Sequence, residues 1–261
     1  MPVLAWIIFA SLASGLLSIG LAALFALNVH SNKWISVLVS YAIGALLGAA
    51  FLNALPEALE LTESPKQLTL ILLLGILIFF ILEKLLLWRH CHLSECEAHE
   101  PAIQIKPHDH GRSGMMIVLG DTFHNFVDGI LIATAFMADI QLGIVTAIAI
   151  TAHEIPQEAG DFIILLNSGF TRARALWFNL LSGAATLFGG LLGYFMLYQL
   201  DHMIAPILAM AAASMIYVAM SDLIPSLHKR PEIRATIQQV TLIILGISTI
   251  WLIGIFFGHN H

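Results

Sequence analysis

Charged residues are scarce in this chain. They make up 11% of its 261 residues, whereas a soluble protein carries about 25%. Lysine and arginine together number only 11, which excludes a nucleic-acid-binding protein because such proteins need a basic surface. Cysteine is rarer still, and both copies fall in one segment, so the sequence predicts no disulfide framework.

Long apolar stretches stand where the charges are missing. Hydrophobic residues make up 59% of the chain, and stretches of near membrane length recur throughout it. Because a helix of about 20 apolar residues crosses a bilayer, we expect an all-α integral membrane protein in contact with lipid. The apolar start, residues 2–27, lacks the basic region and cleavage site of a signal peptide, so we expect a retained span. A single transmembrane domain over residues 1–261 is predicted.

Eight transmembrane helices follow from these stretches. Their expected ranges are 3–28, 35–58, 68–88, 115–136, 142–166, 175–198, 203–226 and 236–257. Every basic residue except Lys66 falls in or beside the first, third, fifth or seventh connection. The positive-inside rule places these connections in the cytoplasm and both termini outside.

Metal-ligand residues lie in the middle of the fourth and fifth expected spans. An ionisable side chain costs about 2.5–3.5 kcal/mol at the centre of a bilayer, so several together need compensation, and a bound cation is the simplest form of it. At helical spacing, the residues of each span form a stripe on one face. The first stripe contains Asp121, His124, Asn125 and Asp128, and the second contains Glu154, Gln157, Glu158 and Asp161, with His153 beside Gln157.

Two facing stripes of imidazole, carboxylate and amide groups can ligate a divalent cation, and mixed nitrogen and oxygen donors suit zinc, iron or manganese. The alternative interpretation is that these groups join the helices through hydrogen bonds. Further polar residues predict an outer vestibule and an acidic route inward. They are Asn53, Glu57, Asp121, Asp161 and Asp222.

The motifs resemble those of a known family. GDTFHNFVDG, residues 120–129, resembles the fourth-span signature of the ZIP (Zrt/Irt-like) metal transporters. HEIPQEAGDF, residues 153–162, is similar to the H-E-x-P-H-E-x-G-D-F signature of one large ZIP subfamily. YVAMSDLIP, residues 217–225, and NALPE, residues 53–57, resemble the family's seventh and second spans.

The resemblance implies eight spans, both termini outside, and uptake of a divalent metal toward the cytosol, typically zinc, with iron, manganese or cadmium in some members. It also implies a homodimer and alternating access by one helix bundle sliding against another. A two-metal centre between the fourth and fifth spans is implied as well. His124, Asp128 and His153 match metal-binding positions, and Asn125, Glu154 and Glu158 match positions at or beside the second metal.

The chain departs from the subfamily at Gln157, which replaces a histidine. An amide is a neutral, weaker donor than imidazole, so the number of ions, one or two, and the preference for zinc stay open.

A compact transporter of the plasma membrane is expected.

Residues 89–114 form the longest connection, which we expect in the cytoplasm. A tract rich in cysteine and histidine is typical of metal binding, although this one lacks the fixed pairs of a structural zinc module. It either catches or senses metal, or it is a polar connection with no such role. The candidate ligands are His90, Cys91, His92, Cys96, His99, His108 and His110.

Metal transport is the leading functional prediction, and we do not expect an enzyme. The main alternative is an intramembrane metal-dependent hydrolase with Glu154 or Glu158 as its base. The H-E-x-x-H pattern of membrane zinc proteases fails at Gln157. A third alternative is a metal sensor without flux.

Overall fold

The computed structural model describes residues 2–28, 32–91, 112–228 and 232–257. Throughout these residues every regular element is a helix. In chain order they are α1 (Val3–Asn28), α2 (Asn32–Ala49), η1 (Ala50–Ala54), α3 (Leu55–Glu60), α4 (Pro65–Cys91), α5 (Arg112–Ala138), α6 (Ile140–Asn167), α7 (Arg172–Leu197), η2 (Asp201–Met203), α8 (Ile204–Tyr217), η3 (Val218–Leu223), α9 (Ile224–Leu227) and α10 (Ile233–Phe257). Each range expected from hydropathy coincides with one helix or one continuous run of helices.

Six stretches of the described residues are long and apolar enough to cross a membrane. They are Val3–Leu24, Ser36–Glu60, Pro65–Leu82, Arg172–Leu197, Ile204–Leu227 and Ile233–Ile255. α5 and α6 are as long, at 27 and 28 residues, but they carry the two polar stripes, which lower their hydropathy. The prediction of an all-helical membrane protein is thereby confirmed.

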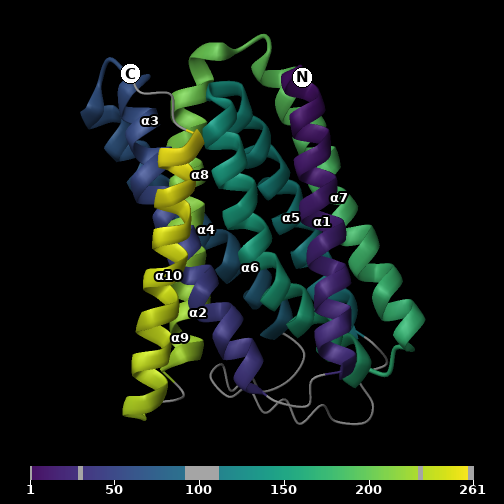
Figure 1. Cartoon of the computed structure of the whole chain (residues 1–261). Coiled ribbons are helices and arrows are strands. Elements are labelled where there is room, and N and C mark those ends of the chain that lie inside the picture. Colours follow the sequence, from purple (N-terminus) through teal and green to yellow (C-terminus); the bar gives the residue numbers. More distant parts are fainter. Residues whose placement is uncertain (1, 29–31, 92–111, 229–231, 258–261) are drawn as a thin grey trace.

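The helices form two groups that meet where α2 packs against α6 (Figure 1). One group contains α1, α5, α6 and α7, and the other contains α2, α4, α8 and α10. Buried aliphatic residues such as Leu46 and Leu208 hold the second group together. The start of α1 and the end of α10 lie at the same end of the bundle.

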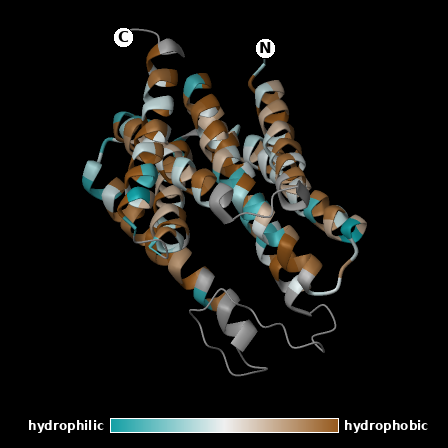
Figure 2. Cartoon of the chain, turned by 60° about the horizontal axis from the view of Figure 1, so that its bottom comes forward, coloured by the Kyte–Doolittle hydropathy of each residue, from teal (hydrophilic) through white to brown (hydrophobic). Residues whose placement is uncertain are grey.

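Large apolar side chains cover the outside of the bundle. Phe9, Trp177, Phe188 and Ile237 are all exposed by more than half of their surface. Apolar residues, brown in Figure 2, dominate the helical ribbon. Exposed apolar surface of this extent indicates contact with another apolar phase, which for helices of this length is the lipid bilayer.

Small residues bring α5 and α7 into close contact within the first group. A Cβ added to Gly129 would clash with the backbone oxygen of Thr186, and one added to Gly189 would clash with the backbone oxygen of Phe126. Close backbone approach through small residues is the usual means of packing helices in membranes. α7 therefore presents its buried face directly to the helix that carries the first polar stripe.

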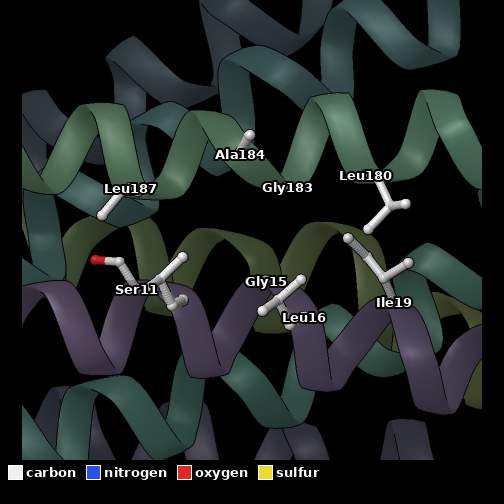
Figure 3. Close-up of a pocket in the computed structure, with 9 residues that line it drawn as sticks. Ser11, Gly15, Leu16, Ile19, Leu180, Gly183, Ala184 and Leu187 are labelled. Carbon is white, nitrogen blue, oxygen red and sulfur yellow. The ribbon is translucent and has the colours of Figure 1, made fainter.

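α1 and α7 border an apolar groove (Figure 3). Gly15 and Gly183 face each other in its middle, where a Cβ on Gly15 would come within 2.9 Å of the Gly183 backbone oxygen. Ser11 lines one end and Ile19 the other. The groove contains none of the residues that the sequence analysis assigns to metal.

Two π-helical turns interrupt otherwise regular α-helical runs. η1 precedes Pro56, and η3 precedes Pro225. Proline has no N–H and crowds the carbonyl four residues earlier, and a π turn is one way for the helix to accommodate that change. η1 packs against α8, while η3 packs against α2, so the two turns lie on neighbouring helices.

Candidate metal centre

A turn of one residue places the two polar stripes opposite each other. α5 ends at Ala138 and α6 begins at Ile140, and the extended Asp139 between them caps α6 by accepting hydrogen bonds from the N–H groups of Gln141 and Leu142 at 2.8 and 3.1 Å. The two helices are antiparallel neighbours of nearly equal length. Positions midway along each must therefore meet, as the sequence analysis predicts.

Four side chains converge at this midpoint: His124 and Asp128 from α5, and His153 and Glu154 from α6. His124 Nε2 lies 3.2 Å from His153 Nε2, 3.6 Å from Glu154 Oε1 and 3.8 Å from Asp128 Oδ2. His153 Nε2 lies 3.3 Å from Asp128 Oδ2 and 3.4 Å from Glu154 Oε1. Tetrahedral zinc with bonds of about 2.1 Å separates its ligands by about 3.4 Å. Five separations among these four atoms, 3.2–3.8 Å, are close to that value, and all of the atoms lie within 4.8 Å of one another.

The orientation of His153 fits the same geometry. Its Nδ1 lies 3.3 Å from the backbone oxygen of Ala149, one turn earlier in α6. A histidine that donates a hydrogen bond from one ring nitrogen to a carbonyl keeps a lone pair on the other nitrogen and points it in a fixed direction. This is the usual arrangement of a metal-binding imidazole. His153 is buried, whereas about a quarter of the His124 side chain is exposed.

A second group contains only carboxylates: Asp121, Glu154 and Glu158, whose nearest oxygens lie within 4.8 Å of one another. Glu154 belongs to both groups. Both oxygens of Glu154 and of Glu158, together with Asp128 Oδ2, are buried without a hydrogen-bond partner in the described part of the chain. Within the same residues, their only ion-pair contacts are with histidine, never with lysine or arginine. Buried carboxylates without a donor or a basic partner are costly unless a cation compensates them.

Asp121 is the exception among these carboxylates. Side chains from α6, from α7 and from its own helix, α5, all donate hydrogen bonds to it. Its Oδ2 accepts a hydrogen bond from the Ser182 hydroxyl. Its Oδ1 accepts from Asn125 Nδ2 at 3.1 Å and from Gln157 Nε2 at 3.3 Å. Gln157 thus contacts the carboxylate group rather than the group that contains the histidines.

Asn125 is held from α7 as well. Its Oδ1 accepts a hydrogen bond from Thr186 Oγ1 at 2.8 Å, and Asn179 Nδ2 of the same helix donates to the backbone oxygen of Glu158 at 3.3 Å. The polar residues of α7 were not predicted from the sequence to belong to the site. Asn179, Ser182 and Thr186 recur at helical spacing beside glycines on its buried face, a signal that was present in the sequence.

The predicted route residues have different surroundings. Asp121 joins the centre. Asn53 lies in η1, and its buried Nδ2 has no hydrogen-bond partner among the described residues. Glu57 in α3 and Asp161 in α6 are half-buried and belong to neither of the two groups of candidate metal ligands, which we call the donor groups. The backbone of Asp222 lies in η3, and its side chain is outside the described part of the structure.

The candidate ligands of the long connection fall outside the described residues. His92, Cys96, His99, His108 and His110 lie within 92–111, and the side chains of His90 and Cys91, which end α4, are likewise not described.

Comparison with known proteins finds a family of metal transporters. A family model described as the ZIP zinc transporter matches residues 88–254. The chain is 31% identical over 272 residues to zinc transporter ZIP13 of Pongo abelii, covering 93% of this chain and 77% of that protein. It is 28% identical over 282 residues to the zinc transporter ZIP13 homolog of Drosophila melanogaster, with coverage of 87% and 79%. Zinc transporter YKE4 of Saccharomyces cerevisiae is 34% identical over 178 residues, with coverage of 64% and 49%.

Proposed function

Because the chain belongs to the ZIP family of zinc transporters, and so transports a divalent metal, we propose that the metal passes through the two buried donor groups between α5 and α6. The observation that carries this proposal is the spacing of His124, Asp128, His153 and Glu154, whose facing atoms are arranged like the ligands of one tetrahedral ion. An ion there would compensate carboxylates whose only basic neighbours among the described residues are the two histidines.

The topology proposed for this route has eight spans with both termini outside. α5 and α6 are long enough to cross the bilayer, and the polar groups that lower their hydropathy face each other rather than lipid. The start of α1 and the end of α10 lie at one end of the bundle, which fits an even number of crossings (Figure 1). The distribution of basic residues supports the cytoplasmic position of the long connection.

Zinc is the proposed principal substrate, because the four-atom group mixes two imidazoles with two carboxylates. The all-carboxylate group offers a second position with harder donors, which suits manganese or iron, so one or two ions can occupy the centre. Uptake toward the cytosol and a homodimer are proposed from the family resemblance, and the plasma membrane is the proposed location. A hydrolase is not proposed, since the relatives are named as transporters.

Sealed proteoliposomes that contain a zinc-sensitive dye test this proposal. The wild-type protein should carry zinc inward, and His153→Ala should lose nearly all uptake because one of four ligands is removed. His228→Ala, which changes an exposed histidine beyond α9, is the matched control and should transport normally.

Two results would contradict the proposal. Normal uptake by His153→Ala would remove the site from the route. Zinc binding by the wild-type protein without any flux would instead identify a sensor.

A further inference from the structure

Thr186 and Ser182 reach the centre without belonging to either donor group. Thr186 donates to Asn125 Oδ1, and Asn125 Nδ2 donates in turn to Asp121 Oδ1 and, at 3.4 Å, to Ser182 Oγ. Ser182 donates directly to Asp121 Oδ2. All four residues are buried, with exposures of 0–6%. The bonds form a connected network from α7 to a carboxylate of the second group.

This network fixes a side chain that would otherwise be free to turn. The terminal torsion of asparagine is broad and nearly two-fold, so packing alone sets its amide poorly. The Thr186 hydroxyl holds the oxygen end, and this directs the NH₂ end at Asp121. Donation to the amide oxygen also makes the amide a stronger donor, because hydrogen bonds in series polarise one another.

The carboxylates of the centre are held very unequally. Asp121 accepts hydrogen bonds from three different side chains, whereas within the described residues Glu154 has histidine ring nitrogens beside its carboxylate and Glu158 has Asn125. Asp121 is thus the fixed member of the carboxylate group. Its position is set from α7, a helix that supplies no candidate ligand.

We propose that Thr186 and Ser182 are positioning residues for metal selection. They hold Asp121, and with it the geometry of the carboxylate group, without contacting the metal. The inference rests on the proposed function, because it assigns these residues to the same centre. Their network ends on the group in which every metal ligand is a carboxylate oxygen. Loss of the network should therefore weaken manganese binding more than zinc binding, because zinc can also bind to the group that contains the two histidines.

Thr186→Val and Ser182→Ala test the proposal in proteoliposomes, with initial uptake rates measured over a range of zinc and of manganese concentrations. Removing a group that orients a metal ligand costs about 10- to 100-fold in metal affinity. We expect the apparent KM for manganese to rise at least about tenfold and that for zinc about threefold, with maximal rates within about twofold. Thr186→Ser keeps the hydroxyl and should restore both KM values.

A matched control separates positioning from packing. Thr134 is also a buried threonine, but its hydroxyl donates only to the backbone oxygen of Ile130 in its own helix. Thr134→Val should leave both KM values unchanged. In an Asn125→Ala background, Thr186→Val should add no further effect, since its action passes through Asn125. Where that background transports too slowly, thermal stabilisation by added manganese replaces the uptake measurement.

Distinct outcomes overturn the inference and the proposed function. Unchanged KM values in both α7 variants, or equal losses for zinc and manganese accompanied by less folded protein, would reduce Thr186 and Ser182 to packing residues. If His153→Ala abolishes uptake in the same preparation, the proposed function stands while the inference fails. If His153→Ala transports normally, the proposed function fails first.

Discussion

Replacing Asp128 with asparagine tests the four-atom group with the smallest change in shape. Asp128 Oδ2 lies 3.3 Å from His153 Nε2 and 3.8 Å from His124 Nε2, so it forms two edges of the tetrahedral arrangement. Its side chain is almost fully buried, so water cannot readily replace it. Asp128→Asn keeps an oxygen at this position but removes the negative charge that draws a dication there.

The magnitude follows from linkage between binding and stability. Groups that only orient a ligand are worth about 10- to 100-fold in affinity, so losing an anionic ligand should weaken zinc by at least about 100-fold. At a zinc concentration 100 times the wild-type Kd, binding stabilises the wild-type protein by about 2.7 kcal/mol. The same zinc concentration equals the Kd of such a variant and stabilises it by about 0.4 kcal/mol.

Thermal unfolding in detergent, followed by tryptophan fluorescence with and without zinc, measures this difference. The zinc-dependent rise in Tm should shrink to roughly one seventh in Asp128→Asn. Asp139→Asn is the matched control, because asparagine also caps a helix and Asp139 lies outside both donor groups. A full zinc-dependent shift in Asp128→Asn would refute the tetrahedral assignment.

Three further predictions concern the rest of the chain. Gln157→His should lower the apparent zinc KM and sharpen the preference for zinc over manganese in competition assays, because it adds a nitrogen donor beside the carboxylate group. An unchanged preference would exclude this position as a ligand. Cys91 and Cys96 should react with a membrane-impermeant maleimide only after cells are permeabilised; labelling of intact cells would reverse the proposed orientation. Replacing all histidines and cysteines of residues 89–114 with serine should leave substantial metal uptake, and its complete loss at normal surface abundance would make this connection essential.

The sequence alone was sufficient to predict the helices and the facing positions of the two stripes midway along α5 and α6. Hydropathy located the apolar stretches, and the i, i+3, i+4, i+7 spacing placed Asp121, His124, Asn125 and Asp128 on one side of α5. Since the turn at Asp139 contains a single residue, equal distances along α5 and α6 bring His124 opposite His153. These relations are local, so periodicity reveals them.

Which residues of a stripe face the histidines and which face α7 was not predictable in this way. Asn125 and His124 are adjacent in sequence, yet His124 Nε2 faces His153 whereas the Asn125 oxygen is bonded to Thr186. That difference depends on how closely α7 packs on α5, which the glycines at 129 and 189 permit. Asp121, expected along the route, joins the carboxylate group for the same reason, since Ser182 of α7 holds it there. Such contacts are long-range, and one sequence does not specify them.

Glu154 is the one side chain common to the group with histidines and the group of carboxylates. An ion that moves from one group to the other would keep Glu154 as a ligand for the whole step. It would exchange its other bonds in turn, and at no point would it stand bare in the hydrocarbon interior. The barrier between the two groups should therefore be lower than for an ion that had to release all of its ligands before it met new ones.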